Sequence, residues 1–255
     1  IKTIRLRGKI SQGLVLPVPG GVSEGEDVTD LLGIIMYKPP IPTHLSGQVL
    51  RNFPSLIPKT DEIRIQSAPT VIKEFDGIQV YITTKINGSS MTVYQHEGHF
   101  GVCSRNLELR DVDGNSLWYL AKKYGLNVKS DIMEGFAIQG EIAGPGIQKN
   151  PLHLQSLELF VFSAYDIKAG RYLDFVDAKQ KADRLGLRFV PVEFVGQFQF
   201  TIEELLVKAG GVYLGTINNK EGIVIRPTTE TMSEVLSGRL SVKVLNNAYL
   251  LKEEE

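Results

Sequence analysis

The sequence between residues 81 and 94, Tyr81-Ile82-Thr83-Thr84-Lys85-Ile86-Asn87-Gly88-Ser89-Ser90-Met91-Thr92-Val93-Tyr94, predicts two β-strands joined by a tight turn. β-Branched and aromatic residues alternate on both sides of an Asn-Gly pair, which is the strongest short signal for a β-hairpin. Such a hairpin would hold Lys85 at the edge of a sheet, beside a glycine that lets another group approach closely. Taken alone, the stretch is equally well explained as a surface hairpin with an ordinary lysine.

The composition is that of an ordinary globular protein. The 255 residues are 42% hydrophobic and 22% charged, and they suffice for one large or two small domains. The net charge of −1 means that affinity for nucleic acid has to come from a local patch among the 28 Lys and Arg residues. The single cysteine, Cys103, excludes an internal disulfide framework and a cysteine-based zinc site. With no signal-peptide pattern and no apolar run of membrane-spanning length, we expect an intracellular protein, in the cytoplasm or the nucleus.

Residues 1–42 and 43–255 are predicted to form separate parts of the chain. The first part is expected to hold two short strands, over residues 2–10 and 11–16, and a linker with a short helix at residues 27–32. In the second part, helices and strands follow each other in no regular alternation. This order favours an α+β fold with antiparallel sheets flanked by helices over a doubly wound parallel sheet. The predicted helices cover residues 115–124, 177–185 and 202–209, and the principal strands cover residues 136–141, 157–165, 221–226 and 240–245.

Charged residues stand at the edges of four apolar strands, where burial without a partner is costly. They are Lys85, Glu141, Glu221 and Lys243, and Arg105 follows a further strand. Each of them alone is explained by a strand end that reaches solvent. Together they suit a polyphosphate and its metal ion, because lysines neutralise phosphate and carboxylates hold hydrated Mg²⁺ or Mn²⁺.

The order of these pieces resembles that of the covalent nucleotidyltransferases, which are the ATP-dependent DNA and RNA ligases and the mRNA capping enzymes. Any one matching block is a weak signal, whereas six in the family's order are a strong one. The resemblance implies an α+β nucleotidyltransferase domain that is ATP-grasp-like. The matching blocks are Lys85-Ile86-Asn87-Gly88, Ser104-Arg105-Asn106, Gly140-Glu141-Ile142, Phe162-Ser163-Ala164-Tyr165-Asp166-Ile167, Glu221-Gly222-Ile223-Val224-Ile225-Arg226 and Val242-Lys243-Val244.

Within that family the chain is most similar to RNA ligases, through the block at residues 162–167 and the segment 243–252. The opening residues 5–13 resemble those of RNA ligases that carry an N-terminal OB-type module, so residues 1–42 are expected to be the end of such a module. The resemblance implies a monomeric RNA repair enzyme without a membrane partner. Its substrates would be RNA 3′-OH and 5′-phosphate ends, held at a nick or in a duplex.

The resemblance also implies a role for each matching residue. Lys85 would attack the α-phosphorus of ATP and form a lysyl-AMP intermediate, and Lys243 would neutralise the α-phosphate. Glu141 and Glu221 would hold the water ligands of Mg²⁺ or Mn²⁺, with Asn87 contributing through water. A free lysine has a pKa of about 10.4, so its neutral form costs about 4–5 kcal/mol at pH 7, and a metal ion and nearby cations recover part of that. The implied nucleotide-binding residues are Arg64, Thr84, Ile86, Asn87, Gly88, Arg105, Phe162 and Arg226, with Phe162 stacking on adenine and Arg64 orienting the pyrophosphate.

Two positions depart from the family's motifs. Asn87 stands where aspartate is usual, and Leu245 stands where a second lysine often follows the first. Asn87 is explained either as a natural variant or as an engineered change from aspartate. Two other functions remain open: a capping-type guanylyltransferase, which would be labelled by GTP, and a nucleotide- or RNA-binding homologue that has lost catalysis.

Overall fold

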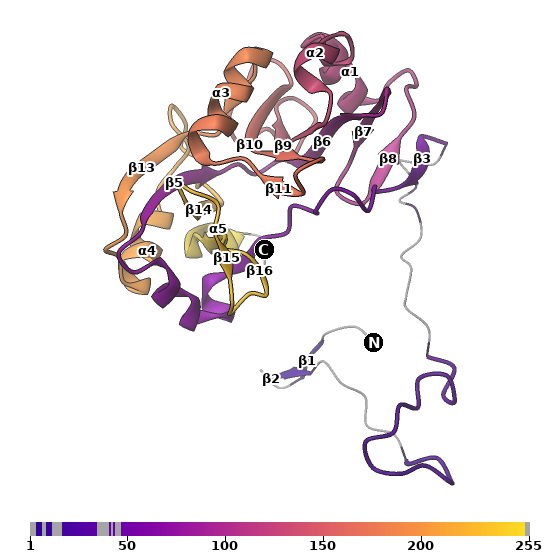
Figure 1. The fold of residues 1–255 in the computed structure, drawn as a ribbon. Coiled ribbons are helices and arrows are strands. Elements are labelled where there is room, and N and C mark those ends of the chain that lie inside the picture. The colour runs from indigo at the N-terminus through magenta and orange to yellow at the C-terminus, as the bar shows by residue number, and fades with distance from the viewer. Residues whose placement is uncertain are drawn as a thin grey trace. The chain divides into compact units, whose positions relative to one another are not determined.

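The computed structural model describes residues 4–6, 9–11, 17–34, 41, 43 and 47–252 (Figure 1). The chain divides into two compact units, Ile1–Ser46 and Gly47–Glu255. The predicted boundary after residue 42 and the OB-type origin of the first part stay predictions.

In the first unit, β1 (Ile4–Leu6) pairs antiparallel with β2 (Lys9–Ser11). The second strand was expected at residues 11–16, of which 12–16 lie outside the described residues. The expected helix at residues 27–32 is wrong, because this segment consists of turns. The carboxylate of Asp27 accepts a hydrogen bond from the amide of Thr29 at 2.9 Å, a local bond that competes with helix formation.

The second unit contains a large sheet with the strand order β11-β10-β9-β6-β7-β8-β3, in which every neighbouring pair is antiparallel. A short strand, β12 (Arg188–Phe189), pairs parallel with β10. The strands are β3 (Val49–Asn52), β6 (Ser89–His96), β7 (His99–Cys103), β8 (Leu107–Leu109), β9 (Phe136–Ala143), β10 (Glu158–Asp166) and β11 (Arg171–Tyr172).

A small sheet has the order β13-β5-β14-β17-β4, and its pairs are antiparallel except for β17 with β4. Its strands are β4 (Ile63–Arg64), β5 (Gln79–Lys85), β13 (Val192–Gln197), β14 (Gly222–Pro227) and β17 (Val242–Leu245). A separate ribbon is formed by β15 (Met232–Ser233) and β16 (Gly238–Arg239). The antiparallel α+β fold expected from the sequence is confirmed.

Helices flank both sheets (Figure 1). The large sheet is contacted by α1 (Ser116–Lys123), α2 (Ser130–Met133) and α3 (Phe175–Leu185), and the small sheet by α4 (Ile202–Ala209) and the 3-10 helix η2 (Ile65–Ser67), which adjoins a second 3-10 helix, η3 (Pro69–Phe75). A third 3-10 helix, η4 (Leu126–Val128), follows α1, and α5 (Asn247–Lys252) follows β17. In the part of the chain that the structure describes, none of these helices is both long and apolar enough to cross a membrane.

The three helices predicted for the second part of the chain are present as α1, α3 and α4, and local contacts explain where they begin or end. The side chain of Asn115 accepts hydrogen bonds from the amides of Leu117 and Trp118 at 3.0 Å and so caps α1. Gly186 ends α3 in the left-handed conformation, which glycine adopts without strain.

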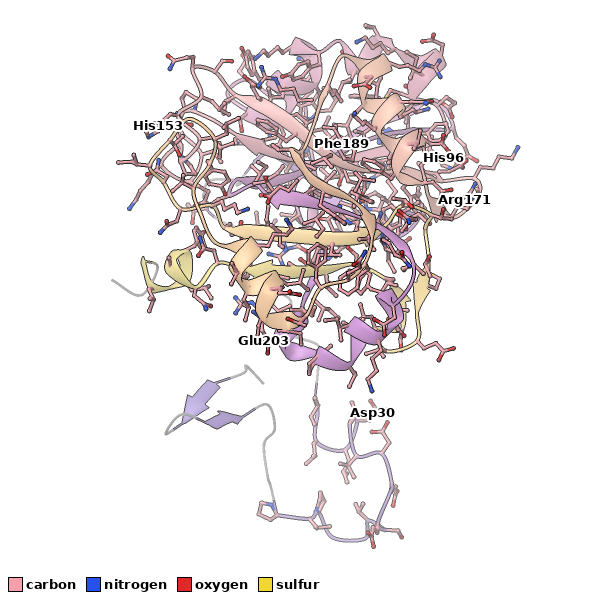
Figure 2. The ribbon with its side chains drawn as sticks, turned by 90° about the vertical axis from the view of Figure 1, so that its left-hand side faces the viewer. Asp30, His96, His153, Arg171, Phe189 and Glu203 are labelled. Atoms are coloured by element: carbon pink, nitrogen blue, oxygen red, sulfur yellow. The ribbon has the colours of Figure 1, made fainter. Side chains whose placement is uncertain are left out.

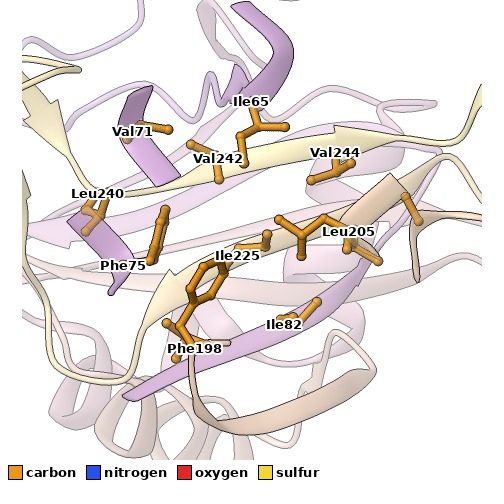
Figure 3. Packing of buried hydrophobic residues seen from close by; sticks show 13 residues of the cluster. Ile65, Val71, Phe75, Ile82, Phe198, Leu205, Ile225, Leu240, Val242 and Val244 are labelled. Carbon is orange, nitrogen blue, oxygen red and sulfur yellow. The ribbon is translucent and has the colours of Figure 1, made fainter. Parts of the chain in front are cut away.

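An apolar cluster under the small sheet holds its strands in place (Figure 3). Ile82 of β5 and Ile225 of β14 are fully buried there, against Phe75 of η3 and Leu205 of α4. Burial of a side chain of this size stabilises the fold by about 1.5–3 kcal/mol. Because Lys85 is the last residue of β5, this core fixes the strand that carries it.

The expected β-hairpin around Asn87-Gly88 is wrong. Although β5 and β6 are consecutive, β5 pairs with β13 and β14 in the small sheet, and β6 pairs with β7 and β9 in the large sheet. Residues 86–88 therefore connect the two sheets. Gly88 is required by close approach, since a Cβ atom there would lie 2.1 Å from the carbonyl oxygen of Ile142. The strands were predicted correctly, but the pairing depends on partners far away in the sequence.

Candidate active site

A cavity of about 330 Å³ lies between the two sheets, at the connection formed by residues 86–88. The small sheet contributes residues of β5, β14 and β17 to its walls, and the large sheet contributes residues of β6, β9 and β10. Of the residues implied by the resemblance, the structure brings ten to this cavity: Thr84, Lys85, Ile86, Gly88, Arg105, Glu141, Phe162, Glu221, Arg226 and Lys243. Arg64 and Asn87 lie outside its lining.

Lys85 and Glu221 form an ion pair inside the cavity. The Nζ atom of Lys85 lies 2.9 Å from Oε1 of Glu221, and the two side chains are 22% and 17% exposed. The register of the small sheet causes this contact, because Lys85 pairs with Gly222, the residue after Glu221. At Gly222 a Cβ atom would lie 2.0 Å from the carbonyl oxygen of Val244, so only glycine allows β17 to approach β14 this closely.

Glu141 approaches the same point from the large sheet. Burial raises the pKa of Glu141 to about 7, with Glu221 adding to the shift and Lys85 and Arg105 opposing it. The backbone amide of Gly88 also donates to this carboxylate. Near neutral pH, Glu141 is therefore balanced between a neutral acid and a carboxylate, and a further positive charge in the cavity would favour the carboxylate.

This pKa gives a first prediction, on the replacement Glu141→Gln. In the folded protein the carboxyl stays protonated up to about pH 7, whereas in the unfolded chain it ionises near 4.5. The wild type therefore loses stability as pH rises between these values, and the loss is complete above pH 7. Glutamine does not ionise, so the stability of the variant relative to wild type should rise by up to about 3 kcal/mol across this interval and then stay level.

Urea unfolding of both proteins at a series of pH values measures this difference. A difference that stays flat across this pH interval would mean that the carboxyl of Glu141 ionises normally in the folded protein.

Lys243 supplies a second cation to the cavity. It lies on β17, opposite Val224 of β14 and beside Arg64 of β4. Burial lowers the pKa of Lys243, and the charges of Lys85 and Arg64 lower it further, while Glu221 and Glu62 oppose the shift. Three cations thus gather at this end of the small sheet, which is an arrangement suited to an anion with several charges.

Phe162 is the aromatic residue that lines the cavity, and Arg226 packs against its ring. The guanidinium of Arg226 lies 5.5 Å from the centroid of the Phe162 ring, and its Nη1 donates to the Phe162 carbonyl oxygen at 3.3 Å. Arg226 is only 2% exposed and is paired with Glu62 at 2.6 Å. Burial alone would lower the pKa of Arg226, but Glu62 and Tyr81 hold this pKa above its usual range. Arg226 thus contacts Phe162 and Glu62 and also lines the cavity, and the nucleotide contact implied by the sequence stays a prediction.

The remaining implied residues differ in their freedom to bind a ligand. The Arg105 side chain is 63% exposed and pairs with Asp61 at the rim of the cavity. The hydroxyl of Thr84 donates to Glu193 at 2.7 Å, and Ile86 is buried in an apolar cluster that includes Phe160. The backbone amide of Asn87 donates to the phenol oxygen of Tyr213 at 2.9 Å.

The sequence interpretation missed Tyr213, which lies outside all six matching blocks. Its hydroxyl donates to the Lys85 carbonyl oxygen at 3.0 Å and accepts from the amides of Asn87 and Glu221. Nothing in the sequence signals this contact, because Tyr213 lies in an irregular loop far from Lys85 along the chain.

A second cavity, of about 600 Å³, adjoins the first and shares with it Thr60, Asp61, Glu62 and Phe162. Its walls also include Tyr165 and Tyr172, and Arg239, whose guanidinium lies 4.0 Å from the Tyr172 ring centroid. The segment of residues 60–62 therefore lies between two neighbouring hollows on the same side of the large sheet.

The carboxylates fit a hydrated divalent cation better than a directly ligated one. Among the described residues, no three His, Cys, Asp or Glu side chains come together as a direct metal site. Figure 2 shows His96 and His153 on opposite sides of the second unit. Glu141 and Glu221 do face one cavity, and two carboxylates suit Mg²⁺ or Mn²⁺ that keeps several of its waters.

Comparison with known proteins agrees with this geometry. Residues 78–245, which contain Lys85, Glu141, Glu221 and Lys243, match the family model described as RNA ligase. The chain belongs to the RNA ligase family. This RNA ligase family member is also similar to solved structures of an RNA ligase from Naegleria gruberi, at 36% sequence identity and a TM-score of 0.74.

These structures are the Naegleria ligase with PPi, a mutant of it with AMP and Mn, and another mutant with ATP and Mn. Each comparison covers 99% of this chain and 76% of the Naegleria chain. A comparison with curated proteins finds no match. The family and its nucleotidyltransferase fold, both expected from the sequence, are thereby confirmed.

Proposed function

We propose that this RNA ligase transfers AMP from ATP to its own Lys85 and then to an RNA 5′-phosphate, which an RNA 3′-OH attacks to seal the strand. The observation that carries the assignment of Lys85 is its position in the cavity between the sheets, 2.9 Å from Glu221 and among Lys243 and Glu141. The family match and the Naegleria structures with ATP, AMP and Mn support ATP as the substrate and a divalent metal as the cofactor.

In the first step, the Nζ atom of Lys85 forms a bond to the α-phosphorus while the bond from that phosphorus to the pyrophosphate oxygen breaks. Lys85 has to lose a proton for this attack, and the carboxylate of Glu221 is within reach to accept it. Lys243 neutralises charge on the α-phosphate as it develops. Glu141 and Glu221 would hold a hydrated divalent cation here, and its positive charge would disfavour the ammonium form of Lys85.

Phe162 is proposed to stack on the adenine, and Arg226 holds the Phe162 ring in place. Arg105, exposed at the rim, is placed to contact the ribose or the incoming 5′-phosphate once it leaves Asp61. Arg64 lies next to Lys243, which supports a role in orienting the pyrophosphate.

The RNA partners we propose are a 3′-OH and a 5′-phosphate held side by side at a nick or in a duplex, acted on by a monomer. The second cavity supports this proposal, because it gives room for a nucleoside next to the nucleotide, across residues 60–62. An intracellular location stays a prediction based on composition.

Labelling with radioactive ATP or GTP, with Mg²⁺ or Mn²⁺ present, tests the proposed function. After denaturing electrophoresis, ATP should label the protein and GTP should not. Adding nicked duplex RNA should then discharge the label and give a sealed strand faster than adding single strands does. Labelling by GTP alone would indicate the capping-type alternative, and the absence of any label would indicate a homologue without catalysis.

Asn87 gives a second prediction. Asparagine removes one negative charge from the position where aspartate is usual, and a charge at 4 Å is worth about 4 kcal/mol at an effective dielectric of 20. A contact through water is longer and weaker, so the loss should be partial. Asn87→Asp should speed single-turnover adenylylation and lower the metal concentration that gives half the maximal rate.

The measurement is a metal titration of the single-turnover rate, with Asn127→Asp, an exposed position on η4, as the control for added charge. If Asn87→Asp leaves both quantities unchanged or slows the reaction, asparagine is the working residue at this position.

A further inference from the structure

The chain loses its regular strand pairing at Lys85. Residues 86–88 cross from the small sheet to the large one, so backbone groups on both sides of the crossing need partners other than a neighbouring strand. Glu221 stands at the equivalent point of the adjacent strand, one residue before β14 begins. Lys85 and Glu221 therefore stand where the pairing of β5 with β14 ends, next to backbone that this pairing no longer holds.

The phenol oxygen of Tyr213 satisfies three of these backbone groups at once. It accepts from the amide of Asn87 at 2.9 Å and from the amide of Glu221 at 3.2 Å, and it donates to the carbonyl oxygen of Lys85 at 3.0 Å. A hydroxyl has one donor and two acceptor positions, so the hydrogen-bonding capacity of Tyr213 is fully used.

Tyr213 is itself rigidly held. It is only 4% exposed, and its ring packs against Ile86 and Val190 in a buried cluster. Burial raises the pKa of Tyr213 to about 12, so the phenol keeps its proton at neutral pH. Its own backbone amide donates to Asn218 at 3.0 Å, which closes the loop that carries it.

We propose that Tyr213 is a positioning residue for lysine adenylylation, which ties the backbone of Lys85 and Asn87 to that of Glu221 through one hydroxyl group. The side chain touches neither nucleotide nor metal in this role. It adds to the strand pairing, which ends at Lys85 and Gly222, a direct link between the backbone of the nucleophile and that of the carboxylate. This inference rests on the proposed function.

The test is Tyr213→Phe, which keeps the ring in the cluster and removes only the hydroxyl. Single-turnover adenylylation should slow by about 10–100-fold, since small displacements of a reacting group cost this much. The ATP concentration that gives half the maximal rate should stay within about twofold of wild type, because the nucleotide-contacting side chains are unchanged. Sealing of RNA that already carries 5′-AMP should be much less affected, because it does not require attack by Lys85.

Two controls separate positioning from a general loss of stability. Tyr119→Phe removes a hydroxyl from an exposed tyrosine of α1 and should leave all rates unchanged. Leu126→Val, at a fully buried position in η4 outside both cavities, should lower the melting temperature without slowing adenylylation selectively.

If Tyr213→Phe adenylylates Lys85 at the wild-type rate, or if it slows both reactions equally, as a destabilised protein would, the inference is overturned. A wild type that forms no adduct would instead contradict the proposed function, so the two failures are distinguishable.

Discussion

Lys85→Ala is expected to abolish the covalent AMP adduct, because among the described residues no other amine pairs with Glu221. The Nζ atom of Lys85 lies 2.9 Å from this carboxylate in the cavity. Lys243, the other lysine that lines the cavity, lies on β17, opposite Val224. The loss should be complete in a single-turnover assay with labelled ATP, below the detection limit at any metal concentration.

The same variant should still seal RNA that already carries 5′-AMP, since that reaction does not need a lysyl adduct. Lys122→Ala, on the exposed surface of α1, is the matched control and should be labelled as the wild type is. An adduct of normal yield in Lys85→Ala would show that a different residue is the nucleophile.

Replacing the two cavity carboxylates is expected to have the second largest effect. Glu221→Gln and Glu141→Gln keep the size of each side chain and remove its charge. Groups that act through metal-bound water typically change activity by about 10–100-fold when they are lost, and we expect adenylylation to slow by this much in each variant. ATP binding should change little, because Lys243 and Phe162, which are proposed to contact the nucleotide, are unchanged in both variants.

Glu221→Gln should be the more severe of the two, because it also removes the partner of Lys85 at 2.9 Å. The double variant should be less impaired than the product of the single effects, since both carboxylates act at one cavity and are electrostatically coupled. Single-turnover rates across a metal titration measure this. Adenylylation of both single variants at the wild-type rate would mean that the two carboxylates are structural.

The strands were predictable because their signal is local. Apolar runs and alternation identified β9, β10, β14 and β17, and the charged residues at their edges turned out to line one cavity. The pairing of β5 with β6 was predicted wrongly because an Asn-Gly pair signals a hairpin only when its two flanking strands belong to one sheet. The strand β5 joins the small sheet through partners more than a hundred residues away, β13 and β14, whereas β6 pairs with β7 and β9 in the large sheet.

The residues that support the site were beyond prediction for the same reason. Tyr213 reaches Lys85 across a separation of 128 residues, and Arg226 pairs with Glu62 across 164. Arg226 ends a matching block and lines the cavity, but its contacts with Phe162 and Glu62 could not be read from that block. A motif thus indicates which residues gather at a site, while their individual partners follow from the tertiary fold.

Peptide mapping of the labelled protein tests the central claim most directly. After incubation with ATP and Mn²⁺, trypsin should fail to cut after a modified Lys85, which leaves one peptide from Glu74 to Arg105 in which Lys85 is the sole internal lysine. Digestion at neutral pH preserves the acid-labile bond between lysine and phosphorus. We expect mass spectrometry to find AMP on this peptide, with the modification at Lys85. AMP on the peptide that contains Lys243, or on any other lysine, would contradict the account.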